Sequence, residues 1–326
     1  MRVCYLIQSH KNPEQIYRLV RTIKTSCPDS FIVLSHDFSG SDLDVARLKD
    51  LSGIEVIPGV GGRGDFSIVQ GYLDAIGWLL RQNISFDWLI NLSGQDYPTQ
   101  PLSQIKKFLA ETHYDGFLEY FKVFSDESHW TLREGYTRYL YQYRKLKSLS
   151  QLPEWLKELS TPVKIINYIQ PYFRLNLAYG MVGVRSTAPF DENFICYGGS
   201  FFGTLSRKCV EYLYDFYQCH PSVVSYYRGV SVSDESFIQT VLVNSRLFNL
   251  CDDNKFYFDF SGTRNGRPRL LTTNDYVSIV QSHAHFARKF DVSKDSKILD
   301  LFDGKIFANQ DESLQVSSSQ ERLGVK

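Results

Sequence analysis

Two neighbouring carboxylates stand in a short polar segment, Ser233-Asp234-Glu235-Ser236, directly before an apolar run with helical spacing. Exposed backbone N–H groups and the helix dipole favour acids at such a position, so one interpretation makes Asp234 only a helix cap. The other makes Glu235 a general base. With an ordinary pKa of about 4.3 it is ionised at neutral pH and can take a proton from a sugar or serine hydroxyl as that hydroxyl attacks.

Two adjacent cations lie near the C-terminus in His285-Phe286-Ala287-Arg288-Lys289-Phe290. Arginine binds phosphate as a fork of donors and lysine as a point charge, so Arg288 and Lys289 can together neutralise a diphosphate. The competing interpretation is a solvated basic pair between aromatic residues.

The sequence offers no metal-binding motif. His283 and His285 form an H-x-H pair, but no Cys or His stands at ligand spacing from them. No D-x-D motif follows a predicted strand, and Asp252-Asp253 lacks that pattern. We therefore expect neither a metal ion nor another cofactor.

A polar turn, Ser93 to Pro98, follows a buried apolar run at 88–92. Its hydroxyl, amide, carboxylate and aromatic ring suit a polyhydroxylated ligand, although Asp96 and Pro98 are also common in ordinary turns. A second small-residue segment, Gly198 to Phe202, contains Ser200 and offers backbone donors at close range, or forms a tight turn.

Strand and helix patterns alternate through the first third of the chain and must position these groups. Apolar strand-like runs occur at 3–7, 31–35, 54–57, 88–92 and 116–123, with helical patterns from 13, at 42–49, at 67–82 and at 102–112. Asn12 is the expected cap of the first helix, with Pro13 at its first position. The alternation predicts an α/β fold with a mainly parallel sheet flanked by helices. Asp37, the glycine cluster 59–65 and Asp96 are then expected along one sheet edge.

The chain is expected to form one domain, residues 1–309, with an irregular insertion at about 125–186. A basic aromatic stripe at 136–147 within it fits a solvated helix face or, alternatively, an acceptor-binding or membrane-surface element. Residues 310–326 are polar and are expected to be a disordered tail.

Composition excludes some classes of function. Lys+Arg and Asp+Glu both number 36, so no basic excess supports nucleic-acid binding. Six scattered cysteines without a CxxC pair favour free thiols. No apolar run reaches the length of a membrane span, so we expect a cytoplasmic protein, at most recruited peripherally to a membrane.

Taken together, these segments resemble the core-2/I-branching β-1,6-N-acetylglucosaminyltransferase and peptide O-xylosyltransferase family of inverting sugar transferases. The matching stretches occur in family order and are Leu6–Pro13 (LIQSHKNP), Asp87–Pro98 (DWLINLSGQDYP), Tyr197–Arg207 (YGGSFFGTLSR), Ser233–Ser245 (SDESFIQTVLVNS) and Phe286–Asp291 (FARKFD). The resemblance implies a GT-A-like, Rossmann-type fold with a mixed C-terminal part, a UDP-sugar donor, and catalysis without a metal ion.

The resemblance also implies roles for individual residues. Glu235 corresponds to the catalytic base, and Arg288 with Lys289 to the diphosphate clamp. The nucleotide-sugar contacts would also include Asp37, Arg63 and one further arginine. Arg264, Arg267 and Arg269 compete for that last place, and Arg269 is taken as the candidate. The residues expected at the acceptor or the transferred sugar are Asp96, Ser200 and Asp234.

The acceptor and the donor sugar stay open. The implied donor is UDP-GlcNAc or UDP-xylose, and the acceptor is a glycan, a peptide or a lipid-linked molecule. The chain departs from many members at Arg63, where they have Trp, and it is expected to lack the membrane anchor and disulfides of the animal enzymes. The alternative function is a catalytically idle module that binds a nucleotide sugar or a glycan.

Overall fold

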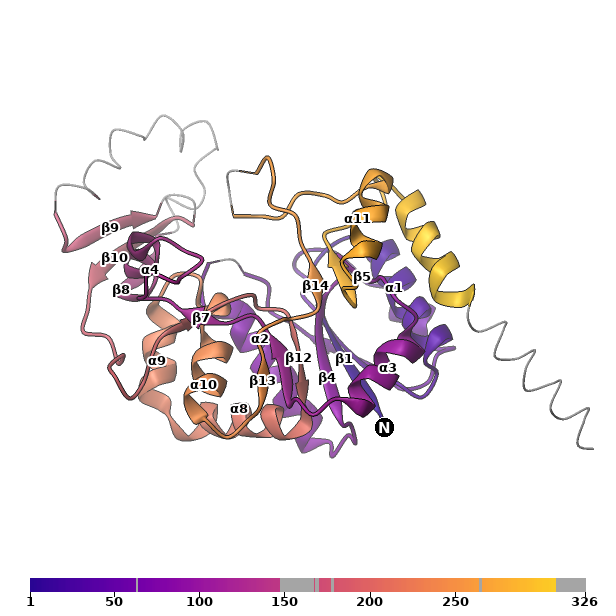
Figure 1. The fold of residues 1–326 in the computed structure, drawn as a ribbon, viewed down its shortest axis with the longest axis horizontal. Coiled ribbons are helices and arrows are strands. Elements are labelled where there is room, and N and C mark those ends of the chain that lie inside the picture. Colours follow the sequence, from indigo (N-terminus) through magenta and orange to yellow (C-terminus); the bar gives the residue numbers. More distant parts are fainter. Residues whose placement is uncertain (63, 147–166, 168–169, 177–178, 264–265, 309–326) are drawn as a thin grey trace, which may run out of the picture.

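The computed structural model of the chain describes residues 1–62, 64–146, 167, 170–176, 179–263 and 266–308 (Figure 1). Its largest sheet has seven strands in the order β13-β6-β12-β4-β1-β2-β3. The strand β1 (Val3–Ser9) pairs in parallel with β2 (Phe31–His36) and β4 (Trp88–Ser93), and β3 (Ile54–Pro58) continues the parallel set beside β2. The predicted α/β architecture with a mainly parallel sheet is thus confirmed.

The sheet is buried on both faces. Alternate residues of β1 enter two different cores, Tyr5 and Ile7 on one face and Cys4 and Leu6 on the other. The first core includes α1 (Pro13–Ser26), α3 (Leu102–Glu111) and a last helix at 297–308. The second includes α2 (Ser67–Arg81), α8 (Arg207–Cys219), α9 (Pro221–Gly229) and α10 (Phe237–Ser245). Helices therefore cover both faces, as Figure 1 shows.

The strand predicted at 116–123 is wrong as a single element. It forms β6 (Gly116–Leu118) in the large sheet and β7 (Phe121–Lys122), which pairs with β11 (Tyr197–Gly198) instead. Between β4 and β6 lies β12 (Gly203–Ser206), antiparallel to both, while β13 (Leu250–Cys251) pairs in parallel with β6. Because β12 comes from much later in the chain than β4 and β6, the local alternation of strands and helices could not reveal it.

A smaller sheet sits at the carboxyl end of β4. It consists of β14 (Phe256–Tyr257), β15 (Phe286–Arg288) and β5 (Asp96–Pro98), in the order β14-β15-β5. Near it, η4 (Thr273–Asp275) leads into α11 (Tyr276–Gln281). The polar turn after the central strand is thereby joined to the segment that carries Arg288.

The described part of 125–186 is more regular than expected. It contains α4 (Leu132–Tyr139) and an antiparallel sheet of β8 (Tyr141–Lys145), β10 (Met181–Arg185) and β9 (Phe173–Asn176). The predicted tail at 310–326 lies outside the described residues, as do 147–166.

Two local predictions need correction. The helix expected at 42–49 is a short 3₁₀ turn, η1 (Val45–Leu48). Pro13 begins α1 as predicted, but the Asn12 side chain makes no cap hydrogen bond because the residue is left-handed at φ 55. Its backbone carbonyl instead accepts from the N–H groups of Gln15 and Ile16.

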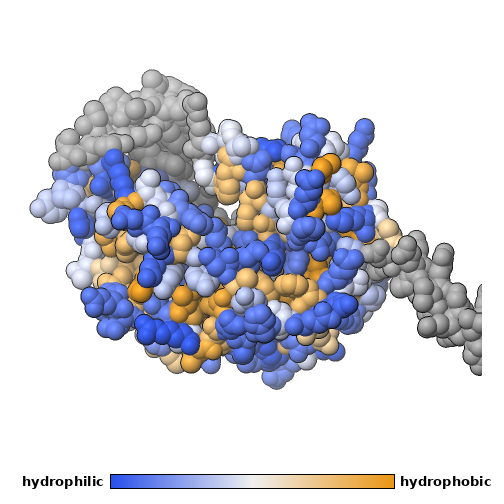
Figure 2. Space-filling view, viewed as in Figure 1, coloured by the Kyte–Doolittle hydropathy of each residue, from blue (hydrophilic) through white to orange (hydrophobic). Residues whose placement is uncertain are grey.

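Bulk features agree with a globular chain. All six cysteines are free thiols, four of them buried. No helix among the described residues combines the length and apolar character needed to cross a bilayer. Hydrophilic and hydrophobic residues are intermixed on the face shown in Figure 2.

Candidate active site

A cavity of about 1160 Å³ opens at the carboxyl ends of the central parallel strands. Gln8 of β1 and Ser93 of β4 line one side of it, Arg288 of β15 a second, and Glu235 of the 3₁₀ turn η3 (Ser233–Glu235) a third. Elements far apart in sequence thus meet where open α/β sheets usually bind ligands.

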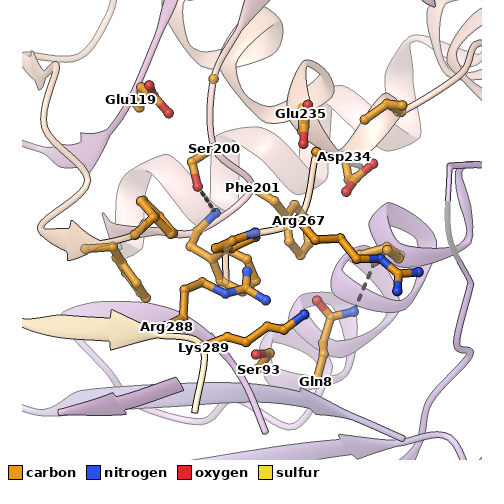
Figure 3. Close-up of a pocket in the computed structure, with 18 of the residues that line it drawn as sticks. Gln8, Ser93, Glu119, Ser200, Phe201, Asp234, Glu235, Arg267, Arg288 and Lys289 are labelled. Carbon is orange, nitrogen blue, oxygen red and sulfur yellow. Dashed lines mark hydrogen bonds between the residues drawn. The ribbon is translucent and has the colours of Figure 1, made fainter. Parts of the chain in front are cut away.

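Five of the predicted site residues line this cavity: Ser200, Asp234, Glu235, Arg288 and Lys289. Three others, Asp37, Asp96 and Arg269, are not among its lining residues. Arg63 lies outside the described residues, as does the competing Arg264. The acids lie on the upper side of Figure 3, and Arg288 and Lys289 lie on the lower side.

The acidic turn begins at a strained residue. Val232 has φ 56 and ψ 48, a left-handed conformation that is costly for a β-branched side chain. Tyr139 Oη donates to the Val232 carbonyl at 3.0 Å, and the Val232 N–H donates to the Gly64 carbonyl at 3.1 Å. The surrounding structure therefore holds the backbone that presents Asp234 and Glu235.

Buried hydroxyls fix the other end of this turn. Tyr227 Oη lies 2.9 Å from both Ser236 Oγ and Thr240 Oγ1. Ser236 has φ −147, so it separates η3 from α10, which begins at Phe237. The interpretation of Asp234 as the cap of α10 is therefore wrong: Ser236 occupies the N-cap position, and among the described residues the buried Asp234 Oδ1 has no hydrogen-bond partner.

Burial dominates the electrostatics of the two acids. It raises the pKa of Asp234, and the neighbouring Glu235 charge raises that pKa further. Burial also raises the pKa of Glu235, while Arg138 opposes the rise with an Nη1–Oε2 bond of 2.6 Å. The Glu235 side chain keeps 34% of its surface accessible, so a substrate in the cavity can reach it.

Arg288 faces the acids from a half-buried position, with 16% of its side chain accessible. Its Nε lies 3.2 Å from Asp96 Oδ1 as an ion pair outside hydrogen-bonding geometry, and its guanidinium stacks 3.8 Å above the Phe202 ring. Burial lowers the pKa of Arg288, whereas the charges of Asp96, Asp234 and Glu235 raise it. Cation and acids therefore share one electrostatic environment.

The two described candidate arginines differ in their surroundings. Arg269 Nε donates to Asp259 at 2.7 Å and its Nη1 donates to Asp275 at 2.9 Å, so these acids raise its pKa and hold it in place. Arg267 lines the cavity. Of these two, the geometry favours Arg267 for contact with a bound diphosphate.

Asp37, which follows β2, binds the glycine cluster that follows β3. Its carboxylate accepts from the Ser39 hydroxyl and from the Gly61 N–H at 2.8 Å, and these bonds lower its pKa. A Cβ on Gly61 would lie 2.2 Å from Asp37 Oδ2, so a larger residue here would displace the Asp37 carboxylate. Since Gly61 and Gly62 line the cavity, Asp37 supports its wall.

The sheet pair β7–β11 forms the opposite rim. Gly198 leaves room for the Trp130 ring, because a Cβ added at Gly198 would lie 2.5 Å from that ring. A Cβ added at Gly199 would lie 1.9 Å from the Glu119 carbonyl oxygen. The Gly199 N–H donates to the Glu235 carbonyl at 2.9 Å. Glu119, Trp130 and Ser200 line the cavity here, and Ser200 Oγ accepts from the Phe202 N–H at 3.3 Å.

A sequence profile described as Core-2/I-Branching enzyme matches residues 4–279, well over half of the chain. The chain belongs to this family of glycosyltransferases. The family resemblance is thus confirmed: four of the five motifs lie within the matched residues, and Phe286–Asp291 lies beyond them.

Curated relatives of the chain come from Arabidopsis thaliana. Beta-glucuronosyltransferase GlcAT14A is 25% identical over 244 residues, 74% of this chain and 47% of the relative. Beta-glucuronosyltransferase GlcAT14C is 23% identical over 334 residues, 97% of this chain and 77% of the relative. The chain thus spans about half the length of GlcAT14A and more of GlcAT14C.

Solved structures are similar only at a distance. The galactosyltransferase LgtC, in complex with donor and acceptor sugar analogs, has 9% identity and a TM-score of 0.35, covering 89% of this chain and 87% of that one. TarS 1–349 of S. aureus, in complex with UDP-GlcNAc, has 14% identity and a TM-score of 0.27, covering 45% and 40%. Similarity this low indicates nothing about substrates.

Two residues of this family member escaped the sequence interpretation. Arg138 falls within the basic stripe at 136–147 but was not separated from its neighbours. Gln15 is fully buried, and its Nε2 donates to the carbonyls of Gly94 and Phe290, both at 3.1 Å. A polar residue beside the apolar stripe of a helix was the available signal for Gln15.

The described part of the chain gathers no set of metal ligands at the cavity. Within the described ranges, no group of three or more His, Cys, Asp or Glu side chains is arranged to hold a metal ion. The positive charge contributed by described residues to this cavity comes instead from cationic side chains, Arg138, Arg267, Arg288 and Lys289 among them.

Proposed function

We propose that the chain is an inverting, metal-independent transferase that moves a sugar from a UDP-sugar to an acceptor hydroxyl, with Glu235 as general base. The observation that carries the proposal is the shared cavity: Glu235 lines it together with Arg288 and Lys289. Family membership supports the same reaction class.

The proposed reaction is one displacement. Glu235 takes the proton of the acceptor hydroxyl as the hydroxyl oxygen bonds to the anomeric carbon. The bond from that carbon to the diphosphate oxygen breaks, and its electron pair leaves with UDP. Because attack and departure take place on opposite faces of the sugar, the anomeric configuration inverts.

The cations take the role that a metal ion has in other nucleotide-sugar enzymes. Arg288, Lys289 and Arg267 would stabilise the negative charge that grows on the departing diphosphate, and fixed charges of this kind cost no reorganisation during the reaction. Asp96 supports the clamp through Arg288, to which it is ion-paired, rather than by contact with the sugar. Transfer is therefore expected to continue in excess EDTA.

The nucleotide is proposed to bind at the carboxyl edge of the sheet. Gln8, Ser93 and Gly61 line this side of the cavity, and the buried Gln8 Oε1 has no hydrogen-bond partner among the described residues. Asp37 fixes Gly61 and is proposed as a uridine-side contact. Ser200 and Asp234 are proposed at the sugar or the acceptor.

The donor sugar is a matter for direct measurement. The motif resemblance favours UDP-GlcNAc or UDP-xylose, whereas the curated relatives are named beta-glucuronosyltransferases. UDP-glucuronate therefore joins those two in a panel of donors, with binding measured as a rise in melting temperature without metal. The strongest stabiliser then defines the donor for transfer assays on glycan, peptide and lipid-linked acceptors.

The test of the mechanism is Glu235→Gln. We expect kcat for transfer to fall by roughly two orders of magnitude or more, with UDP affinity by calorimetry within about twofold of the unchanged protein. Glu211→Gln, on the outer surface of α8 and paired with Arg207, is the control and should keep full activity. Near-normal turnover of Glu235→Gln would remove this residue from the mechanism. A protein that binds UDP-sugars but neither transfers nor hydrolyses them would be the idle binding module.

A further inference from the structure

Arg138 of α4 bridges two glutamates at the rim of the cavity. Its Nη1 donates to Glu235 Oε2 at 2.6 Å, and its Nη2 donates to Glu134 Oε1, one helical turn earlier. The guanidinium also lies 4.1 Å from the centre of the Trp130 ring. With 19% of its side chain accessible, Arg138 is held on three sides rather than extended into solvent.

The groups that face Glu235 are mostly acidic. Asp234 precedes it in η3, while Glu134 of α4 and Glu119 after β6 also act on its charge. The positive groups are Arg138 and Arg288, and the Tyr139 hydroxyl is neutral at physiological pH. A buried carboxyl among other acids would hold its proton, and a protonated carboxyl cannot serve as a base.

The helix that carries Arg138 is tied to the acidic turn. The Arg138 carbonyl accepts from the Ser231 N–H at 3.2 Å, and the Tyr139 hydroxyl binds the Val232 carbonyl. At the other end of α4, Thr131 Oγ1 caps the helix by accepting from the Glu134 N–H at 3.2 Å. The guanidinium and Glu235 therefore keep their relative position through both side-chain and backbone bonds.

We propose that Arg138 is the positioning residue of this site, which keeps Glu235 ionised by binding Oε2 and leaves Oε1 for the acceptor hydroxyl. The inference rests on the proposed function of Glu235. Among the described residues, Oε1 accepts no hydrogen bond, so the oxygen opposite the arginine is the one available to a substrate.

Glu134 has a defined part in this arrangement. An arginine bound to a single carboxylate would stabilise the anion strongly and make it a weak base. Because Arg138 is shared with Glu134, Glu235 receives only part of its charge. Glu134 thus tunes Glu235 towards proton uptake, while Arg138 tunes it towards ionisation.

The two residues therefore have opposite effects, which a pH profile of kcat can measure. In Arg138→Gln, Glu235 loses its counter-charge, so the acidic limb should move up by about one pH unit or more, with activity partly recovered at alkaline pH. In Glu134→Gln, the acidic limb should move down by about half a unit, because an opposing charge is lost and Arg138 is bound by Glu235 alone. Arg138→Lys should lie between wild type and Arg138→Gln.

Controls separate this role from a structural one. Arg185→Gln removes the same charge from an exposed position in β10, outside the cavity lining, and should leave the profile unchanged. Melting temperature and UDP affinity are measured for every variant, since a merely structural arginine would lower activity equally at all pH values. Equal loss across the pH range, or shifts of the same sign in Arg138→Gln and Glu134→Gln, would overturn the inference. Retained activity of Glu235→Gln would instead overturn the proposed function itself.

Discussion

Arg288 and Asp96 are cross-strand partners in β15 and β5, with Arg288 Nε 3.2 Å from Asp96 Oδ1. The aspartate is fully buried and also accepts from the Ser93 N–H at 2.7 Å and the Ser93 hydroxyl at 2.8 Å. Burial raises its pKa, whereas Arg288 lowers it. The acid of the polar turn thus serves as a counter-charge that aims a cation at the cavity.

Asp96→Asn should be costly for this reason. Removing one partner leaves a buried guanidinium without its counter-charge, so we expect the free energy of unfolding to fall by about 3 kcal/mol and UDP affinity to fall with it. Urea denaturation and calorimetry measure the two effects. Asp300→Asn breaks a surface pair with Arg18, whose aspartate is 63% accessible, and should change stability by less than about 1 kcal/mol. Equal effects in the two variants would contradict the buried-pair interpretation.

Arg267→Ala and Arg269→Ala should separate binding from stability. Arg267 lines the cavity, so its loss should weaken UDP binding roughly tenfold with little change in melting temperature. Arg269→Ala leaves Asp259 and Asp275 without their shared cation and should cost about 1–2 kcal/mol in unfolding free energy, with UDP affinity nearly kept. If Arg269→Ala weakened UDP binding and Arg267→Ala lowered only stability, Arg269 would be the residue that contacts the diphosphate.

The acidic pair makes stability depend on pH. Burial raises the pKa of both Asp234 and Glu235, so above their ordinary values the folded chain holds protons that the unfolded chain has released. Their contribution to stability is therefore fully present at low pH and is lost as pH rises through the raised values. Asp234→Asn should flatten this decline and raise the unfolding free energy at pH 8 by about 1 kcal/mol while impairing transfer.

Asp37 provides a contrast. Hydrogen bonds from Ser39 and Gly61 lower the pKa of its carboxyl group. The contribution of Asp37 to the free energy of unfolding is therefore present above its ordinary pKa and is lost on acidification. The loss of stability caused by Asp37→Asn should accordingly disappear as the pH falls. Urea unfolding of both variants across pH 3–8 provides the check. The same sign of pH dependence in both would contradict the assigned environments.

Much of the fold was predictable because its first half is local in sequence. The parallel strands β1 to β4 and the helices between them follow from apolar runs separated by turn residues. Two features were not predictable from the sequence, because each pairs segments far apart in the chain: the insertion of β12 into the large sheet, and the small sheet of β14, β15 and β5. Pairing between segments so far apart leaves no periodic signal in either segment.

The candidate site was predictable where motif and chemistry coincide. Glu235, Arg288 and Lys289 are unusual residue types in their local pattern, and all of them line the cavity. Arg138 looked like one cation among several in a solvated stripe, because its two glutamate partners become visible only when α4 packs against η3. Arg269 looked equivalent to Arg267 until Asp259 and Asp275 were placed around it.

Gly199→Ala tests how rigidly the acidic turn is held. An added Cβ would lie 1.9 Å from the Glu119 carbonyl oxygen, a backbone atom that cannot turn aside, so the loop must move away. That movement strains the bond from the Gly199 N–H to the Glu235 carbonyl. We expect a loss of about 2 kcal/mol or more in unfolding free energy and a fall in kcat. Gly304→Ala in the last helix, where a Cβ meets nothing within 4 Å, should instead stabilise the chain by about 0.5–1 kcal/mol. Wild-type stability and kcat in Gly199→Ala would mean that the Glu235 backbone does not depend on this contact.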